Sequence, residues 1–522
     1  MPILWDMLLI DSSRMKERSN NFYTLLNLFT GIFTVIVSFA TSFFLSPFIV
    51  KSLGAEANGY TQLASNFVMY ATLLTTAFNS MASRFVSVAY HQGKLDKVRE
   101  FYSSVYVVNI GLFLILLPLS FFVALKLEHI IVIENANVVD VKLLFGCVFT
   151  NFLISLGTTL YMISMYVKNA IYYNNLLNCV RTVCNALLLL LVFSILPIKV
   201  FYVSLVAVIL SVLLFPVYVH YQNKLMPELH FERSSFSWSA VKEMLFSGIW
   251  NSVNQCGHLL LTGLDLLLSN LFVSPYAMGV VAVSKTIPSA IIQLATTVNS
   301  NFSPSITQSW AKGDYGFVLR ELRMTIKISI VIVSIPIVTF CCLGSGFYSL
   351  WQPTMDPVIL TVLSILGCLS FMILAGVQVL YNILTASNNL KVNSVSFVLM
   401  GVINVLLVYL GLKYYPSYGM YIIVGTSSVL SIIRQLLIIL PYSAKLMNLP
   451  WYTFYKDVFI TLLCCITNGI IALVIISLLP MSGWMSVITN GLLIVILSVL
   501  AEGFMLLNKN ERKKVIQLIQ RK

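Results

Sequence analysis

The sequence predicts an all-α protein that crosses a membrane about 14 times. Hydrophobic residues make up 58% of the 522 residues and charged residues only 10%. The apolar residues form separate runs of roughly twenty, each long enough to cross a hydrocarbon core of ~30 Å as a helix. No polar stretch between these runs is long enough to fold as a domain of its own. The protein is therefore expected to work within the bilayer or across it.

The predicted spans follow one another with short loops between them. We expect them at residues 22–49, 60–82, 102–125, 142–166, 171–194, 198–221, 246–272, 277–300, 325–350, 358–385, 393–412, 417–440, 454–479 and 484–507. They divide the chain into a cytoplasmic N-terminus (1–21), an N-terminal lobe (22–221), a cytoplasmic linker (222–245), a C-terminal lobe (246–440), two further spans (441–507) and a cytoplasmic basic tail (508–522).

Lysine and arginine predict the orientation. With the N-terminus in the cytoplasm, 25 of the 32 Lys and Arg residues fall in cytoplasmic segments and five in outer loops, while Arg181 and Lys285 lie inside spans. Cytoplasmic loops of membrane proteins carry this excess of positive charge, so both termini are expected in the cytoplasm. The bias explains the net charge of +13, which therefore does not indicate nucleic-acid binding.

The ends of the chain and the cysteines carry less information. Residues 1–10 are apolar but short and acidic, and Met15 to Arg18 has the character of a cytoplasmic start, so a chain beginning at Met15 is expected to function. The tail 508–522 alternates basic and apolar residues, which predicts a short interfacial helix. All nine cysteines fall in apolar runs and are expected to be packing residues. No Cys/His spacing predicts a metal site.

The two lobes are predicted to be a repeat. At a shift of 220 residues, five positions match without a gap, namely Gly59 with Gly279, Asn79-Ser80 with Asn299-Ser300, Gly93 with Gly313, and Val98 with Val318. Spans one to six then correspond to spans seven to twelve. Both members of each pair run in the same direction, so the repeat is parallel, about an axis along the membrane normal. The fold class is two six-helix lobes plus two C-terminal helices.

Two neighbouring spans carry polar stripes. Span seven places Asn251, Asn254, Gln255, His258, Thr262, Asp265 and Ser269 on one side of the helix, and span eight does so with Lys285, Ser289, Gln293, Thr296 and Ser300. The first span has a milder stripe in Asn27, Thr30, Thr34, Ser38, Thr41 and Ser42. Polar groups in hydrocarbon are costly, so these stripes predict a water-filled cavity, with helix–helix hydrogen bonding as the alternative.

The charges inside spans are candidate site residues. Asp265 and Lys285 are predicted to lie about 9–12 Å below the outer surface, close enough in depth for an ion pair that is either structural or functional. Arg181 lies near mid-membrane beside several asparagines and is expected to meet a carboxylate, water or substrate. Arg84 and Arg434 lie nearer the cytoplasmic ends, and Arg434 is expected to snorkel to the interface.

Short motifs mark the ends of several spans. They are Pro47, Leu53-Gly54 and Gly59-Tyr60; Asn79 to Phe85, followed by Gly93; Leu264-Asp265 with Tyr276 and Gly279; and Phe302, Pro304 and Ile306 before Lys312-Gly313-Asp314. Together they resemble the polysaccharide transporters of the multidrug/oligosaccharidyl-lipid/polysaccharide (MOP) superfamily, the Wzx-type O-antigen and capsule flippases, which are related to the MATE exporters. The resemblance spans roughly residues 15–480.

The resemblance implies two lobes around a central, often cationic cavity. It also implies translocation of a polyprenyl-diphosphate-linked oligosaccharide across the bacterial inner membrane by alternating access, for surface polysaccharide biosynthesis. Arg and Lys suit the diphosphate, and amides and hydroxyls suit the sugars. The candidate substrate-binding residues are Arg84, Arg181, Asn254, His258, Lys285 and Gln293, and the candidate coupling or ion-pair residues are Asp265, Lys285 and His258.

The resemblance leaves one close alternative, a cation-coupled multidrug antiporter of the same superfamily. Asp265 keeps that alternative open, although such exporters usually have twelve spans and often a carboxylate in the first span. A membrane enzyme is not expected, because no loop is long enough for a catalytic domain. No cofactor is expected beyond coupling to H⁺ or Na⁺. The expected partners are the lipid-linked oligosaccharide, membrane lipids and other polysaccharide-assembly proteins.

Overall fold

The computed structural model describes residues 20–387, 389–507 and 511–512, and within these ranges every regular element is a helix. The long and medium helices are α2 (Asn20–Leu53), α3 (Ala55–His91), α4 (Leu95–Leu125), α5 (Val138–Val167), α6 (Tyr172–Ile195), α7 (Tyr202–Leu225), α8 (Trp238–His258), α10 (Pro275–Ser284), α11 (Thr286–Ala311), α12 (Tyr315–Trp351), α13 (Pro357–Leu374), α15 (Leu390–Tyr414), α16 (Gly419–Arg434), α18 (Tyr455–Leu478) and α19 (Trp484–Leu506). The shorter elements are η2 (Leu127–His129), η3 (Arg233–Ser235), η4 (Leu259–Gly263), α9 (Asp265–Phe272), η5 (Val377–Leu380), α14 (Tyr381–Ala386), η6 (Pro416–Tyr418), η7 (Gln435–Ile439) and α17 (Leu440–Leu446).

Several helices begin where a polar side chain caps the first turn. The side chains of Asn137, Ser274, Asp314 and Asp356 each accept hydrogen bonds from backbone N–H groups at the start of α5, α10, α12 and α13. These N–H groups have no partner within the helix, so the cap fixes where each helix starts.

The prediction of a polytopic all-α membrane protein is confirmed. In the described part of the chain, 12 helical segments are long and apolar enough to cross a membrane. Of the 14 predicted spans, the two outside that set are α3 and the run from α8 to α9. Both are long enough to span a membrane, but their polar side chains lower their mean hydropathy, as expected for helices that carry polar stripes.

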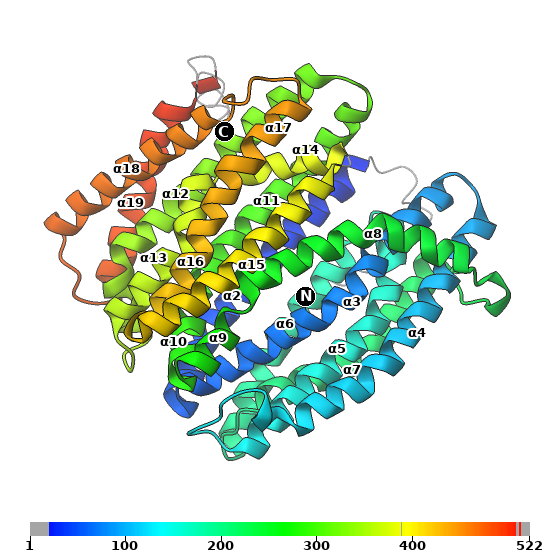
Figure 1. Ribbon diagram of the computed structural model, residues 1–522, viewed down its shortest axis with the longest axis horizontal. Helices are drawn as coiled ribbons and strands as arrows, with labels where there is room; N and C mark the ends of the chain where they lie inside the picture. Colours follow the sequence, from blue (N-terminus) through cyan, green and yellow to red (C-terminus); the bar gives the residue numbers. More distant parts are fainter. Residues whose placement is uncertain (1–19, 388, 508–510, 513–522) are drawn as a thin grey trace, which may run out of the picture. The chain divides into compact units, whose positions relative to one another are not determined.

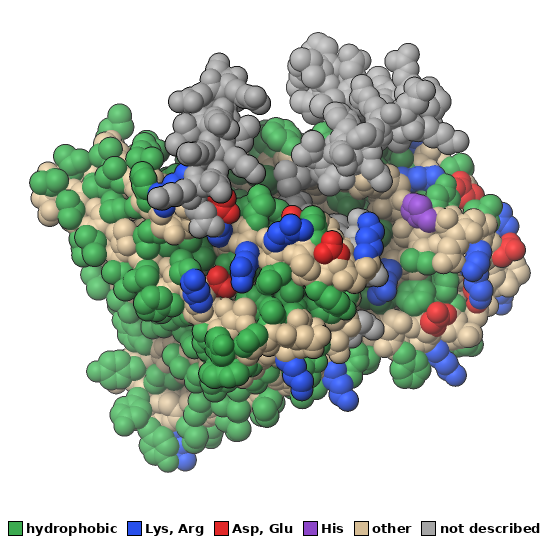
Figure 2. Space-filling view, turned by 90° about the horizontal axis from the view of Figure 1, so that it is seen from above, with side chains coloured by type: hydrophobic (Ala, Val, Ile, Leu, Met, Phe, Trp, Pro, Cys, Tyr) green, Lys and Arg blue, Asp and Glu red, His purple; other side chains and the backbone are tan. Residues whose placement is uncertain are grey.

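The surface of the protein is apolar, as expected for contact with lipid. Large hydrophobic side chains are exposed on many helices; Leu187, Leu473 and Met485 are 62%, 65% and 81% exposed. Figure 2 shows hydrophobic side chains over much of the visible face, with charged side chains gathered in limited patches. A water-soluble protein would not expose so much apolar surface.

The described residues divide into two compact units. The first consists of residues 20–43, 67–130 and 137–252, and the second of residues 44–66, 131–136 and those from 253 onward. In the first unit α5 packs against α4 and α7, and α6 packs against α7. In the second unit α12 packs against α11 and α13, and α12, α18 and α19 lie side by side (Figure 1).

The repeat is visible in the local geometry of each unit. Gly93 and Gly313, which are 220 residues apart, both have φ of 74° and both end a helix. In the first unit Asn79 of α3 and Asn109 of α4 exchange hydrogen bonds of 3.2 and 2.9 Å. At the equivalent positions of the second unit, Ser329 of α12 donates to Asn299 of α11. The same helix–helix bond therefore recurs at the predicted register.

Two spans that are predicted to be continuous helices are interrupted by π-helical turns. Span seven widens at η4, and span twelve widens at η7. Pro441 is the second residue after η7, and a proline ring clashes with the carbonyl four residues earlier in a regular helix, so a wider turn relieves that clash. At η4 the side chain of Asn404 on α15 donates to the carbonyl oxygens of Leu260 and Leu261 over 3.3 and 3.0 Å.

Two predictions lie outside the described residues. They are the start at Met15 and the interfacial helix of the tail, of which only residues 511–512 are described.

Candidate functional site

An ion pair lies inside the second unit, immediately after the π-helical turn η4. Asp265 is the first residue of α9 and is 2% exposed, whereas Lys285 stands between α10 and α11 and its side chain is 27% exposed. Lys285 Nζ donates to Asp265 Oδ2, as the predicted depths allow. The other carboxylate oxygen of Asp265 is buried without a hydrogen-bond partner among the described residues. The pair leaves the amine partly accessible and the carboxylate hidden.

The polar stripe of α11 is accessible next to this pair. Ser289, Gln293 and Thr296 are exposed at helical spacing, beginning one turn after Lys285, and His258 at the end of α8 is also exposed. The intervening Ile291 and Ala295 are 7% and 2% exposed. The exposed side of this helix is therefore its polar side, the reverse of what a helix facing lipid would present.

A second polar cluster surrounds Arg434, and the prediction that Arg434 snorkels is wrong. Arg434 is 3% exposed, and its two terminal nitrogens donate to Asn393 Oδ1 over 2.9 Å and to the Tyr381 hydroxyl over 2.6 Å. Asn393 in turn donates to Asn254 Oδ1 over 3.0 Å. The side chain stays inside because two other helices, α15 with Asn393 and α14 with Tyr381, offer it acceptors. The depth of a single residue in its own span does not reveal such partners.

The face of Phe397 links this cluster to His258. The Arg434 guanidinium lies 4.1 Å from the centre of the Phe397 ring, and the rings of Phe397 and His258 meet edge to face with centres 6.0 Å apart. Stacking on an aromatic face is a favourable setting for a guanidinium. The predicted site residues Asn254 and His258 therefore lie beside a buried cation, Arg434, which is not among the predicted substrate-binding residues.

Small residues allow α8 and α15 to approach closely here. A Cβ atom on Gly401 would lie 2.5 Å from Cβ of Leu260, and one on Gly257 would lie 2.8 Å from the backbone of Phe397. Such close approach is typical of membrane helices that pack through small residues. It brings Asn404 within reach of the η4 carbonyls and so supports the turn that precedes Asp265.

Arg181 lies in the first unit, half-buried on α6. Its Nη2 donates to Asn151 Oδ1 of α5 over 3.0 Å, and the same oxygen accepts from Ser211 of α7 over 2.6 Å. Arg181 forms no ion pair with a carboxylate in the described part of the chain. Arg181 is thus a cation within an apolar span, and no carboxylate among the described residues neutralises its charge.

The milder stripe of the first span serves mainly as a contact between helices. Asn27 donates to the Asn169 carbonyl over 3.1 Å, and Thr34 donates to the Asn175 carbonyl over 2.9 Å. Asn175 also donates to the Thr30 hydroxyl over 3.1 Å. For these positions the alternative of helix–helix hydrogen bonding applies. Arg84, a predicted substrate residue, is exposed on α3.

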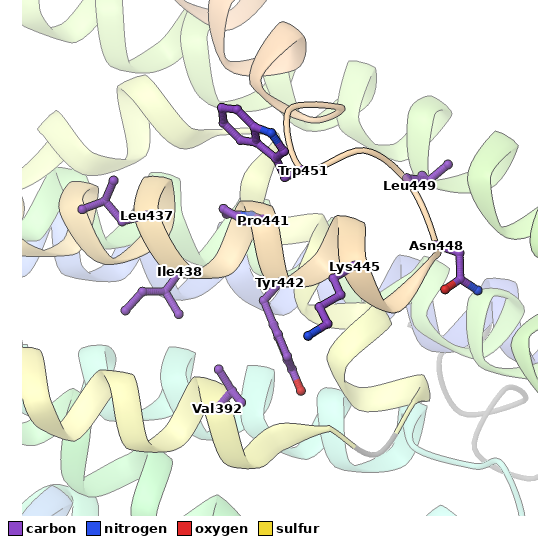
Figure 3. A pocket seen from close by; sticks show the side chains of 9 residues that line it. All are labelled: Val392, Leu437, Ile438, Pro441, Tyr442, Lys445, Asn448, Leu449 and Trp451. Carbon is purple, nitrogen blue, oxygen red and sulfur yellow. The ribbon is translucent and has the colours of Figure 1, made fainter.

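A separate groove of about 610 Å³ opens on the second unit between α15, η7, α17 and the loop before α18 (Figure 3). It is lined by Val392, Leu437, Ile438, Pro441, Tyr442, Lys445, Asn448, Leu449 and Trp451. None of the predicted site residues lines this groove, whose character is mainly apolar. The described residues also contain no cluster of three His, Cys, Asp or Glu side chains able to hold a metal ion.

Comparison with known proteins places these features in a fold family. No protein-family model matches the chain. The chain is 26% identical over 498 residues to the uncharacterized membrane protein EpsK of Bacillus subtilis (strain 168), with 94% of this chain and 97% of EpsK covered.

Solved structures share the fold at low sequence identity. The lipid II flippase MurJ, in an inward closed conformation, matches with a TM-score of 0.66 and 16% identity over 93% of this chain and 100% of MurJ. An inward-facing multidrug resistance MATE family transporter of the MOP superfamily matches with a TM-score of 0.62 and 11% identity over 81% of this chain and 98% of that chain. The protein therefore has the fold of the MOP-superfamily transporters.

Proposed function

We propose that this protein is a flippase for a polyprenyl-diphosphate-linked oligosaccharide. It moves the lipid-linked glycan from the cytoplasmic to the outer leaflet of the bacterial inner membrane by alternating access, with both of its termini in the cytoplasm. The glycan then serves surface polysaccharide assembly, and other proteins of that assembly are the expected partners.

The observation that carries the proposal is the accessible polar side of α11. Lys285, Ser289, Gln293 and Thr296 are at least partly exposed along a helix that is otherwise apolar enough to span the membrane. Burying such groups in hydrocarbon would be costly, so this side is expected to line an aqueous path. Hydroxyls and amides along such a path can replace water around sugar hydroxyls as the glycan passes.

The cations suit the diphosphate. Lys285 keeps part of its amine accessible although it is paired with Asp265, and Arg181 carries a charge that no described carboxylate neutralises. A diphosphate that displaces Asp265 from Lys285, or that reaches Arg181, would gain charge-assisted hydrogen bonds. The lipid tail can remain in the bilayer throughout.

Two observations favour a flippase over a multidrug antiporter. The match to the lipid II flippase extends over 93% of the chain, whereas the match to the multidrug transporter extends over 81%. In addition, the carboxylate of Asp265 is 2% exposed and already bonded to Lys285. A cationic drug would need a free carboxylate, and the accessible partner of this pair is the amine.

A reconstituted assay tests the proposal. The purified full chain is placed in proteoliposomes that hold a fluorescent undecaprenyl-diphosphate-linked disaccharide, and a membrane-impermeant quencher reports which leaflet holds the fluorophore. The native protein is expected to exchange the lipid between leaflets, and the Arg181→Ala/Lys285→Ala double variant is expected to be slow. With Lys285 left native, the Arg181→Lys variant should flip the lipid faster than the Arg181→Ala variant but more slowly than the native protein. Lysine restores the positive charge but not the planar guanidinium fork.

Arg320→Ala is the matched control, because it removes an exposed cation near the start of α12. In cells, the double variant should be present in the membrane at the native level and yet fail to restore surface polysaccharide to a strain that lacks the gene. Native rates and native glycan in the double variant would contradict the proposal.

A further inference from the structure

A buried carboxyl group lies between α12, α18 and α19, away from the site described above. Glu502 of α19 is 0% exposed, and its Oε1 accepts hydrogen bonds from Ser334 Oγ of α12 and from Asn468 Nδ2 of α18, the latter over 2.7 Å. Ser334 and Asn468 are also 0% exposed. Three helices thus converge on one oxygen of this carboxyl.

The other oxygen of this carboxyl has no hydrogen-bond partner among the described residues. Glu502 Oε2, Asn468 Oδ1 and Ser498 Oγ are all buried without a hydrogen-bond partner among the described residues. Asn468 Oδ1 belongs to the same planar amide that bonds Glu502. Ser498 is 0% exposed and stands one turn before Glu502, on the same side of α19. The second oxygen of the Glu502 carboxyl is therefore available to take up a proton.

No positive charge compensates Glu502. It is the only Asp, Glu, Lys or Arg residue within α19, and it takes part in no ion pair in the described ranges. On α18, Cys464 and Cys465 lie close enough to Glu502 to interact with it electrostatically. Lys327 of α12 is engaged by Glu511 over 2.8 Å.

The remaining charges lie toward the ends of these helices. Asp457 near the start of α18 is close to Arg323 and Lys327 of α12. An ionised Glu502 would therefore be a buried charge without a counter-charge and with one oxygen lacking a hydrogen bond, which is a costly arrangement. A neutral carboxyl avoids the cost of the buried charge.

We propose that Glu502 is a proton-binding site that couples transport to the proton gradient. H⁺ binds at Oε2 to give the neutral carboxyl when the cluster is closed, and it leaves to give the carboxylate when water reaches the cluster. Glu502 lies four residues before the end of α19, about 6 Å along the helix axis, so a small opening connects it to the cytoplasmic surface expected there. This inference rests on the proposed transport function, which it extends by naming a coupling ion and its site.

Helix α12 offers a mechanical connection to the substrate path. Ser334 stands two residues before Pro336, which cannot donate a backbone hydrogen bond and so weakens the helix at that point. The same helix bonds α11 through Ser329 and Asn299, and α11 carries the accessible polar side. A change in the bond between Ser334 and Glu502 therefore acts at a weak point of a helix that packs against the site.

Labelling with dicyclohexylcarbodiimide, a membrane-soluble reagent, tests the site without measuring transport. The reagent adds to protonated carboxyl groups in apolar surroundings, with the acid proton passing to a carbodiimide nitrogen. The full chain in lipid vesicles is treated at a series of values from roughly pH 5 to pH 9, and the adduct is located by peptide mass spectrometry. We expect an adduct at Glu502 whose yield falls as pH rises.

Asp265 is the internal control, since it is as buried as Glu502 but bonded to Lys285, and it should not react. Glu502→Gln should remove the adduct, whereas Glu511→Gln, at an exposed pair, should not. A yield at Glu502 that does not change with pH would overturn the proposal, because the carboxyl would then be permanently neutral. Protection by Na⁺ at constant pH would also overturn it in favour of a sodium site.

If dicyclohexylcarbodiimide cannot reach Glu502, infrared spectroscopy tests its protonation directly. The C=O band of a protonated carboxyl should be present in the native protein, lost in Glu502→Gln and lost reversibly at high pH. If no such band titrates, the proposal fails.

Measuring lipid flipping with and without a pH gradient distinguishes failure of the proton site from failure of the proposed transport function. Glu502→Gln mimics the protonated group and keeps hydrogen-bonding capacity, so it should fold normally but lose the acceleration of flipping by a pH gradient. Unchanged acceleration would overturn the coupling role. If the native protein moves no lipid-linked disaccharide while Glu502 still titrates, the proposed substrate is wrong and the proton site stands.

Discussion

Gly59 of α3 and Gly279 of α10, equivalent positions in the 220-residue repeat, pack directly against each other. A Cβ atom on Gly59 would lie 3.0 Å from Cα of Gly279, and one on Gly279 would lie 2.4 Å from the carbonyl oxygen of Ala55. The first residues of α3 and α10 approach this closely because neither position carries a side chain. The same residue type therefore occurs at both equivalent positions because the close packing of α3 and α10 leaves no room for a side chain at either one.

Replacing Gly279 by alanine is expected to destabilise the protein. The new methyl group would meet backbone rather than a flexible side chain, and overpacking of this kind typically costs about 1–3 kcal/mol. Gly59→Ala should cost less, because its tightest neighbour is the end of Met278, at 2.7 Å. Thermal unfolding in detergent, followed by size-exclusion chromatography, ranks the variants.

Gly111→Ala in α4 is the control for that ranking. No atom lies within 4 Å of a Cβ placed there, so alanine should be neutral or should stabilise the helix by about 0.5–1 kcal/mol. Equal unfolding temperatures for the Gly279 and Gly111 variants would show that the close approach is not a constraint.

Arg434→Ala is predicted to lower stability. It leaves Asn393 Oδ1 and the Tyr381 hydroxyl without their donor inside the second unit, a loss of about 1–3 kcal/mol for a buried polar group. Arg434→Lys should recover only part of this, since an ammonium cannot reach both acceptors as a planar fork does. Arg320→Ala, at an exposed position, should stay within about 0.5 kcal/mol of the native protein. An Arg434→Ala protein that unfolds at the native temperature would mean that the cluster contributes no stability.

The fold was largely predictable, because the physical signal for a membrane span lies within a single run of twenty residues. The ion pair between Asp265 and Lys285 was also predictable, because the depth of a residue in the membrane follows from its position along its own span, and the two residues lie in consecutive spans. The burial of Arg434 was not, because it depends on Asn393 and Tyr381, which lie 41 and 53 residues away in sequence on other helices. The π-helical turn at η4 was hidden for a similar reason, since its support comes from Asn404.

Glu502 differs from these cases, because a signal was present in the sequence. It is a lone carboxylate within the last apolar span, and an intramembrane carboxylate marks a functional candidate by default. What the sequence does not supply is the set of partners, Ser334 and Asn468, which come from helices that are distant along the chain.

Asn404→Leu is expected to loosen the turn that precedes Asp265. The carbonyl oxygens of Leu260 and Leu261 lose their donor, and the wider π-helical turn leaves them few alternatives. Hydrogen exchange of the backbone amides at residues 259–265 should therefore be faster than in the native protein. Leu406→Ala, at a 56% exposed position of the same helix, should leave that exchange unchanged. Native exchange in the Asn404 variant would show that the side chain does not support the turn.

The polar side of α11 should be open to water from at least one side of the membrane. With the nine native cysteines replaced, single cysteines at Ser289 and Gln293 should react with a membrane-impermeant maleimide, because both positions are exposed. A cysteine at Leu407 is a matched control, since it is 44% exposed but expected to face lipid, where a thiol does not ionise and reacts poorly. A cysteine at Val283, which is 0% exposed, should not react.

Supply of the lipid-linked glycan should change the maleimide reaction rates at Ser289 and Gln293, because a ligand shifts the equilibrium between inward and outward states by its differential affinity for them. If Gln293 and Leu407 react at the same rate under every condition, α11 faces lipid and the aqueous path does not exist.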